Sequence, residues 1–186
     1  TGAIAGNIDL AIADPVIAIP PTSTVTDWSG GYVGLSYSSV DGTMCYDGTC
    51  NYIYDYSADT AIGVFGGYNW QRSNFVYGGE LNVTVGPLSQ ESHSDELGTR
   101  TELRARVGYA MGDALVYGFL GYGTSSITTS AREYDVAGGT YGLGIDYMVT
   151  DSMFAGLEVS NLELLGQTND EIHNINVISL RIGYNY

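Results

Sequence analysis

Hydrophobic and polar positions alternate with a period of two residues along most of this chain. In "NVISLRIGYNY", at the C-terminal end, Ile178, Leu180, Ile182, Tyr184 and Tyr186 share one parity, and the residues between them are mainly polar. Successive side chains of a β-strand point to opposite faces of the sheet. The pattern therefore predicts a strand with one apolar face and one polar face.

The same alternation predicts eight strands, near residues 30–40, 60–71, 75–86, 99–111, 114–127, 137–149, 153–165 and 172–186. Three connections are the tight turns "RSN", "GD" and "TDS", whereas those near 41–59, 87–98, 128–136 and 166–171 are longer and more polar. In an up-and-down barrel this order places the short turns at one end and the long loops at the other, as in bacterial outer-membrane barrels. The sequence predicts an all-β fold: an eight-stranded antiparallel up-and-down transmembrane β-barrel over residues 28–186, with periplasmic termini and extracellular long loops.

Charged residues within the predicted strands fall on the parity opposite the apolar one. The set comprises Glu80, Glu102, Arg104, Arg106, Asp146, Glu158 and Arg181. In a soluble barrel these side chains would face water, whereas in a membrane barrel they must pair with one another in the lumen. Alternation alone leaves both arrangements open, and the parity of residues 114–127 is ambiguous.

Aromatic residues gather near the strand ends that are predicted to be periplasmic. They are Trp28, Tyr68, Trp70, Phe75, Tyr77, Tyr109, Tyr117, Tyr147, Tyr184 and Tyr186. Aromatic side chains at one level on sequence-distant strands are typical of a membrane-interface girdle. This pattern favours the membrane barrel over a soluble lipocalin-like barrel.

The chain carries a formal net charge of −15, and all six of its basic residues are arginine. Nucleic acid is therefore not an expected partner, because phosphate binding needs a basic face. The two histidines, His93 and His173, lie in or near predicted loops. Ser92, Ser94, Asp95 and Glu96 flank His93, but neighbours in sequence cannot all converge on one reacting atom, as a nucleophile, a base and an orienting acid must. We expect no enzyme activity, no cofactor and no dedicated metal site, although the acidic loops are candidates to share divalent cations with lipopolysaccharide phosphates.

Two cysteines, Cys45 and Cys50, flank a turn-forming Asp-Gly in "MCYDGTCNY". This spacing predicts a disulfide within the first long loop, and a disulfide indicates an oxidising compartment such as the periplasm or cell surface. The chain begins with Thr rather than Met, as a mature product does after signal-peptide removal. A sequence that was cut at this point for another reason would begin in the same way.

Residues 1–27 differ from the rest because they are apolar, contain proline and lack periodicity. We predict an extended periplasmic tail. Its apolar anchors are Ile8, Leu10, Ile12, Ile17 and Ile19. The hypothesis is that this tail docks on a protein partner or a neighbouring barrel, and the alternative is that it lies along the rim of its own barrel.

The segments "DWSGGYVGLSYS", "VFGGYNWQRSNFVYGGEL", "LRARVGYAMGDALVYGFLGYG" and "LRIGYNY" resemble those of the opacity-protein-like small surface-antigen porins of Gram-negative bacteria, with a tail like that of alphaproteobacterial members. The resemblance implies outer-membrane lipid and lipopolysaccharide as surroundings. It also implies recognition of the last strand by the barrel-assembly machinery, although Tyr186 stands where the family usually has Phe. We expect a structural, non-catalytic surface barrel, because eight strands enclose a lumen that side chains can fill. The alternative is a narrow pore for ions or small solutes.

Overall fold

The computed structural model describes residues 2, 25–46, 52–85, 88–89, 96–128, 133–165 and 172–186. Within this part the strands are β1 (Gly30–Tyr46), β2 (Tyr52–Arg72), β3 (Phe75–Val85), β4 (Leu88–Ser89), β5 (Glu96–Met111), β6 (Ala114–Thr128), β7 (Glu133–Met148), β8 (Met153–Leu165) and β9 (Ile172–Asn185). Among the described residues, no helix is long and apolar enough to cross a membrane.

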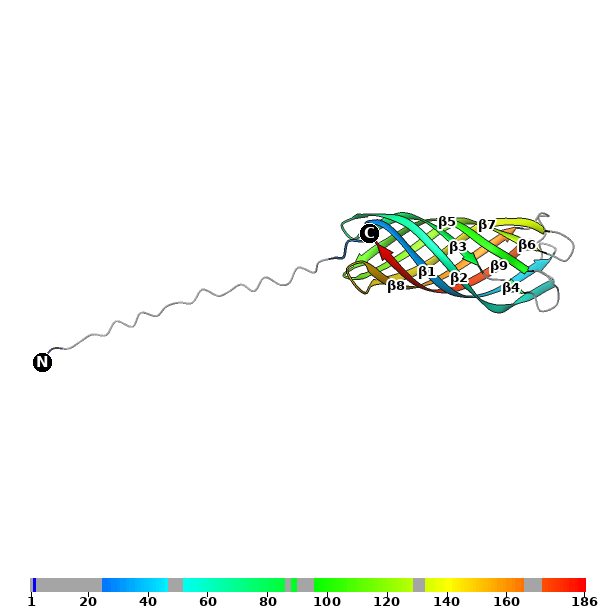
Figure 1. The fold of residues 1–186 in the computed structure, drawn as a ribbon, viewed down its shortest axis with the longest axis horizontal. Coiled ribbons are helices and arrows are strands. Elements are labelled where there is room, and N and C mark those ends of the chain that lie inside the picture. The colour runs from blue at the N-terminus through cyan, green and yellow to red at the C-terminus, as the bar shows by residue number, and fades with distance from the viewer. Residues whose placement is uncertain are drawn as a thin grey trace.

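Eight long strands close into one antiparallel barrel (Figure 1). Sequence neighbours pair with each other, β9 pairs with β1, and β3 pairs with β5, while the short β4 adds a further pairing to β5. The predicted eight-stranded barrel is confirmed. We call the end that holds the start of β1 and the end of β9 the terminal end, and the opposite end the far end.

The strands are staggered around the barrel. Starting from Tyr37 on β1, the register through β2 leads to Val85 on β3. The register in the other direction, through β9, β8, β7, β6 and β5, reaches β3 at Phe75 instead. The two routes end at opposite ends of the same strand, which is the shear that closure of a tilted barrel requires.

The connections at the terminal end are short, as predicted. They are residues 73–74, 112–113 and 149–152. The left-handed φ of 60° at Gly112 suits the turn between β5 and β6, because glycine adopts that conformation without a steric penalty.

At the far end, two of the predicted long connections are largely strand. Pairing between β1 and β2 continues to Tyr46 and Tyr52, and pairing between β6 and β7 continues to Thr128 and Glu133. The predicted strand ends near 40, 60 and 137 are therefore wrong. Apolar alternation is required only where one face meets an apolar environment, so its loss does not end a hydrogen-bonded ladder.

Burial alternates along the described strands, as on β3, where buried Val76 and Glu80 each lie between exposed neighbours. The exposed parity is mainly apolar, and the buried parity carries the charged side chains. The soluble alternative required the reverse arrangement. On β6, whose parity was ambiguous, Leu115 and Tyr117 point inward and Val116 points outward.

Candidate functional site

The barrel interior contains an ion-pair network contributed by β3, β5, β7, β8 and β9. The structure buries all seven residues of the sequence-derived charged set: Glu80, Glu102, Arg104, Arg106, Asp146, Glu158 and Arg181. Arg104 on β5 lies 2.8 Å from both Glu102 and Glu158 and 3.4 Å from Glu80. The register places these groups at neighbouring inward positions, so the closed barrel brings together residues that are far apart in sequence.

The other two arginines complete the network. Arg106 lies 3.0 Å from Asp146 and 3.3 Å from Glu80. Arg181 lies 2.5 Å from Glu80 and also pairs with Glu158. Glu80 thus contacts three guanidinium groups. Buried charges persist only when they are paired and hydrogen-bonded, so these contacts hold one another in place.

A fourth arginine, Arg100, is also buried on β5 and was missing from the sequence-derived set. It shares the parity of Glu102, Arg104 and Arg106, and that parity was the signal that could have identified it. Among the described side chains, four buried arginines therefore accompany the four buried carboxylates. Because these charges balance, the formal net charge of −15 lies outside this buried set.

Aromatic rings surround the guanidinium groups. The Arg106 guanidinium carbon lies 3.8 Å from the ring centroid of Tyr117, and that of Arg181 lies 3.9 Å from the centroid of Phe65. The hydroxyl of Tyr117 donates to Glu158 at 2.9 Å, and the hydroxyl of Tyr32 donates to Glu80 at 3.1 Å. The rings therefore supply both cation–π contacts and hydrogen bonds to the network.

Each large inward ring that a strand carries lies over a glycine on a neighbouring strand. The directly paired positions are Phe65 with Gly34, Tyr32 with Gly67, Phe119 with Gly142, Tyr117 with Gly144, and Phe154 with Gly183. A Cβ atom at any of these glycines would collide with the ring. The glycines therefore make it possible for bulky rings to lie flat inside a narrow barrel.

Two apolar clusters lie on either side of the network. At the terminal end, the cluster includes Trp28, Val76, Ala110, Leu115, Met148 and Phe154. Toward the far end, a second cluster comprises Val40, Ala61, Val136, Leu162, Ile175 and Val177. Side chains thus occupy the described lumen on both sides of the charges.

The segment that precedes β1 closes the terminal end. Trp28 is 2% exposed and contacts Phe154 edge to face, with ring centroids 5.8 Å apart. The backbone N–H of Thr26 donates to the carbonyl of Gly112 at 3.1 Å, and the N–H of Trp28 donates to Gln71 Oε1 at 2.7 Å. We call residues 25–29 the rim segment, because these contacts tie it to the terminal end of its own barrel.

The predicted girdle contained ten aromatic residues, and two of them do not belong to it. Trp28 and Tyr117 are buried in the lumen, so placing them on the outer face was wrong. Trp28 precedes the strand and has no strand parity, and Tyr117 lies on the strand whose two faces are both apolar. The other eight are exposed on the outer wall: Tyr68, Trp70, Phe75, Tyr77, Tyr109, Tyr147, Tyr184 and Tyr186.

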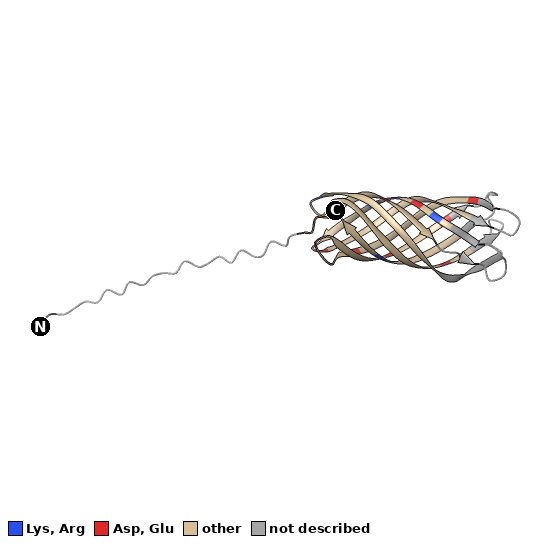
Figure 2. Cartoon of the chain, in the orientation of Figure 1, with Lys and Arg blue, Asp and Glu red and all other residues tan. Residues whose placement is uncertain are grey.

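Between this girdle and the far end, the outer wall is apolar. Figure 2 shows mainly uncharged ribbon along the described length of the barrel. Among its exposed residues are Leu35, Leu81, Leu120, Leu143, Leu157 and Leu180. Toward the far end the wall becomes polar at Asp41, Asn161 and Asn176. An apolar band bordered on one side by aromatic residues matches the lipid-facing surface of a membrane barrel.

Three sequence predictions fall on residues that the structure does not describe. Cys50 lies outside the described part, so the disulfide with Cys45 stays a prediction. The tail anchors Ile8, Leu10, Ile12, Ile17 and Ile19 lie there too, as does His93. Among the described residues, no group of His, Cys, Asp or Glu forms a metal site.

The sequence matches a family model described as the outer membrane protein beta-barrel domain over residues 11–186. It is 29% identical to the 22 kDa outer membrane protein of Rhizobium leguminosarum bv. viciae over 74% of this chain and 65% of that protein, slightly less than two thirds of its length. It is 28% identical to the 25 kDa outer-membrane immunogenic protein of Brucella abortus, over 92% of this chain and 85% of that protein.

Solved structures agree in fold. The Neisserial surface protein A has a TM-score of 0.57 at 11% identity, with 85% of this chain and 98% of that one covered. The Yersinia pestis attachment invasion locus protein has a TM-score of 0.53 at 13% identity, with 84% and 99% covered. The sequence-based resemblance to small outer-membrane barrels, with alphaproteobacterial relatives, is confirmed. The family match, the closed barrel and its apolar outer wall together show that this chain belongs to the outer membrane protein β-barrel domain family.

Proposed function

We propose that this protein is a sealed, non-catalytic surface barrel of the bacterial outer membrane, which displays its far-end connections outside the cell. The observation that carries the proposal is the filled lumen, in which the ion-pair network lies between two apolar clusters. An aqueous pore needs a continuous water path, and these side chains occupy the space that such a path would need.

Conductance measurements test the sealed lumen. The refolded protein, inserted into a planar bilayer, should give no resolved conductance steps, and a porin inserted in the same way serves as the positive control. Reproducible steps that depend on this protein would favour the alternative, a narrow pore for ions or small solutes.

The orientation is also a proposal, with periplasmic termini and an extracellular far end. It is supported by the short turns at the terminal end, because outer-membrane barrels have short periplasmic turns and longer outer loops. An epitope inserted within residues 90–95 should be accessible to antibody on intact cells, and one inserted at residues 112–113 should not. The opposite result would invert the orientation. Exposed loops would also agree with the description of the Brucella relatives as immunogenic.

The tail hypothesis belongs to the same proposal. The proposal is supported by the rim segment, which is held at the terminal end, so the sequence that carries the anchors Ile8, Leu10, Ile12, Ile17 and Ile19 joins the barrel at that end. We propose that they dock on a protein partner or neighbouring barrel at the periplasmic side. Deleting residues 1–24 should leave a folded barrel that no longer co-purifies with that partner. If the truncated protein co-purified with the same proteins as the parent, the tail would be only a spacer.

Assembly and lipid contacts complete the proposal. The last strand, β9, pairs with β1 and is followed by the exposed Tyr186, which supports recognition of this strand by the barrel-assembly machinery. The apolar outer wall supports contact with outer-membrane lipid and lipopolysaccharide. Replacing Tyr186 with Phe should preserve the amount of inserted barrel in outer-membrane fractions, whereas replacing it with Ser should lower it.

A further inference from the structure

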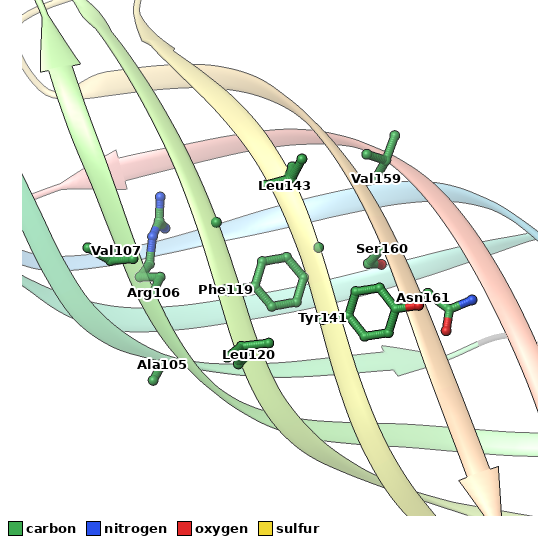
Figure 3. A pocket seen from close by; sticks show the side chains of 12 residues that line it. Ala105, Arg106, Val107, Phe119, Leu120, Tyr141, Leu143, Val159, Ser160 and Asn161 are labelled. Atoms are coloured by element: carbon green, nitrogen blue, oxygen red, sulfur yellow. The ribbon is translucent and has the colours of Figure 1, made fainter.

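The lipid-facing wall carries a groove across β5, β6, β7 and β8, with a volume of about 740 Å³ (Figure 3). Its floor is low because two outward positions hold small residues, Ala105 on β5 and Gly118 on β6. Outward branched side chains, including Leu120, Leu143 and Val159, also line it. A wall of uniformly large side chains would have no such depression.

The groove runs between two chemically different levels of the barrel. Val107 and Gly118 lie toward the terminal end, within the apolar band, and Asn161 lies toward the far end. There the amide nitrogen of Asn161 donates to Asn176 at 3.0 Å and also to Asn174. A polar cluster thus begins where the apolar groove ends.

We propose that this groove holds one acyl chain of a membrane lipid whose uncharged, hydroxyl-rich sugar headgroup contacts the asparagine cluster, defined as Asn161, Asn174 and Asn176. A chain that starts at the cluster and descends to Val107 would bury its methylenes against an apolar floor. The side-chain amides of the cluster offer both donors and acceptors, as sugar hydroxyls and amides require. The class of lipid is therefore an acylated glycolipid.

Charge near the cluster disfavours a bare phosphate headgroup. Asp41 is paired with Asn176, and Glu163 is paired with Asn174, so carboxylates lie beside the cluster on neighbouring strands. Of the arginines whose side chains the structure describes, only Arg72 is exposed, and it lies at the terminal end. These carboxylates would repel a phosphate at the asparagine cluster, so an uncharged sugar suits the site better than an anion.

The same charges argue against a second copy of this chain as the occupant. A two-fold interface in the membrane brings the same surface of each subunit together, with both chains oriented alike. The carboxylates of Asp41 and Glu163 would then approach their own counterparts. A flexible acyl chain can instead follow a narrow groove without bringing a second set of charges to its upper end.

Native mass spectrometry of the folded protein in detergent tests the proposal. The probe is a glucosamine disaccharide that carries amide- and ester-linked acyl chains and no phosphate, and it is compared with phosphatidylethanolamine and phosphatidylglycerol. We expect retention of one disaccharide lipid per monomer. Replacing Gly118 with Leu should fill the groove and weaken retention about tenfold, the equivalent of about 1.4 kcal/mol.

The matched control is Gly66→Leu. Gly66 is an outward-facing glycine on β2, away from the groove, so retention in this variant should equal that of the parent protein. Replacing Asn176, which does not line the groove, with Leu should reduce the preference for the sugar lipid over the two phospholipids. Far-UV circular dichroism of each variant should show an unchanged barrel.

Three results would overturn the inference. Equal retention by the parent protein and Gly118→Leu would exclude the groove, and equal retention of all three lipids would exclude the headgroup assignment. A dimer that Gly118→Leu abolishes would assign the groove to a second copy. The inference rests on the proposed function in one respect: the proposed orientation decides which membrane leaflet supplies the lipid at the far end. Binding in detergent together with inverted epitope accessibility would thus refute the orientation and leave the site standing.

Discussion

The two ends of the lumen are closed by different kinds of side chain. At the terminal end, aromatic rings such as Phe154 lie over glycines of a neighbouring strand, and Trp28 enters from the rim segment. Toward the far end, aliphatic side chains such as Leu162 and Ile175 fill the space, and every described member of that cluster lies on a strand. Closure of the terminal end therefore depends on the strand register, which places rings over glycines, and on the rim segment. Closure of the far end depends mainly on the volume of the aliphatic side chains.

The largest effect is expected between the two ends, where the network couples five strands. Replacing Arg104 with Leu would leave Glu80, Glu102 and Glu158 with fewer cationic partners inside the barrel. Breaking a buried pair from one side destabilises comparable proteins by about 3 to 5 kcal/mol. Urea titration of the refolded protein in detergent should show a lower midpoint for this variant. An unchanged midpoint would disprove the structural role of the network, and exposed Arg72→Leu is the matched control.

The next effect separates the two closures directly. Truncation of a buried Trp typically costs about 3 to 5 kcal/mol and truncation of a buried Leu about 2 to 5, so Trp28→Ala and Leu162→Ala should both lower stability. They should differ in their effect on the rim segment. Only Trp28→Ala should speed hydrogen exchange of the Thr26 amide, which donates to Gly112. Equal protection of that amide in both variants would mean that Trp28 does not hold the segment.

A smaller effect is expected from the ring-over-glycine pairs. An alanine at Gly144 would place its Cβ against the ring of Tyr117, whereas a Cβ at Gly139, exposed on the same strand, meets no atom within 4 Å. Overpacking of a tight interior costs typically about 1 to 3 kcal/mol. The midpoint of urea unfolding should therefore fall for Gly144→Ala and stay within error for Gly139→Ala. Equal midpoints would show that the ring can move aside without cost.

The sequence predicted the wall of this barrel better than its two ends. The period-two pattern is strong wherever one face is apolar, and it placed Glu80, Arg104 and Arg181 on the parity that the structure buries. It failed for Trp28, because a residue before the first strand has no parity. It also failed for Tyr117, because β6 has large apolar residues on both faces.

The strand ends and the groove were beyond sequence reasoning for a different reason. Backbone pairing between β1 and β2 extends to Tyr46 and Tyr52 although the residues there lack an apolar parity. Hydrogen-bond ladders can continue above the apolar band, where composition is unconstrained. The groove depends on Ala105 and Gly118, which are diagonal neighbours on β5 and β6, because Ala105 pairs with Leu120 and Gly118 pairs with Val107. The tight turn between these strands fixes that register, but two small residues on one hairpin do not by themselves reveal a depression that extends across β7 and β8.

The smallest expected effect concerns the far end, where Cys45 and Cys50 are predicted to form a disulfide. The ring would be short, so its loop-closure entropy is small, and the stabilisation should be about 2 kcal/mol at most. Backbone pairing of Cys45 with Ile53 already holds the two strands together, which reduces the contribution further. Reduction should therefore shift the urea midpoint less than Leu162→Ala does, because the aliphatic cluster rather than the covalent link closes this end. A Cys45→Ser, Cys50→Ser variant should match the reduced protein. Alkylation of the native, unreduced protein followed by mass analysis should find no free thiol, and two modified cysteines would refute the disulfide.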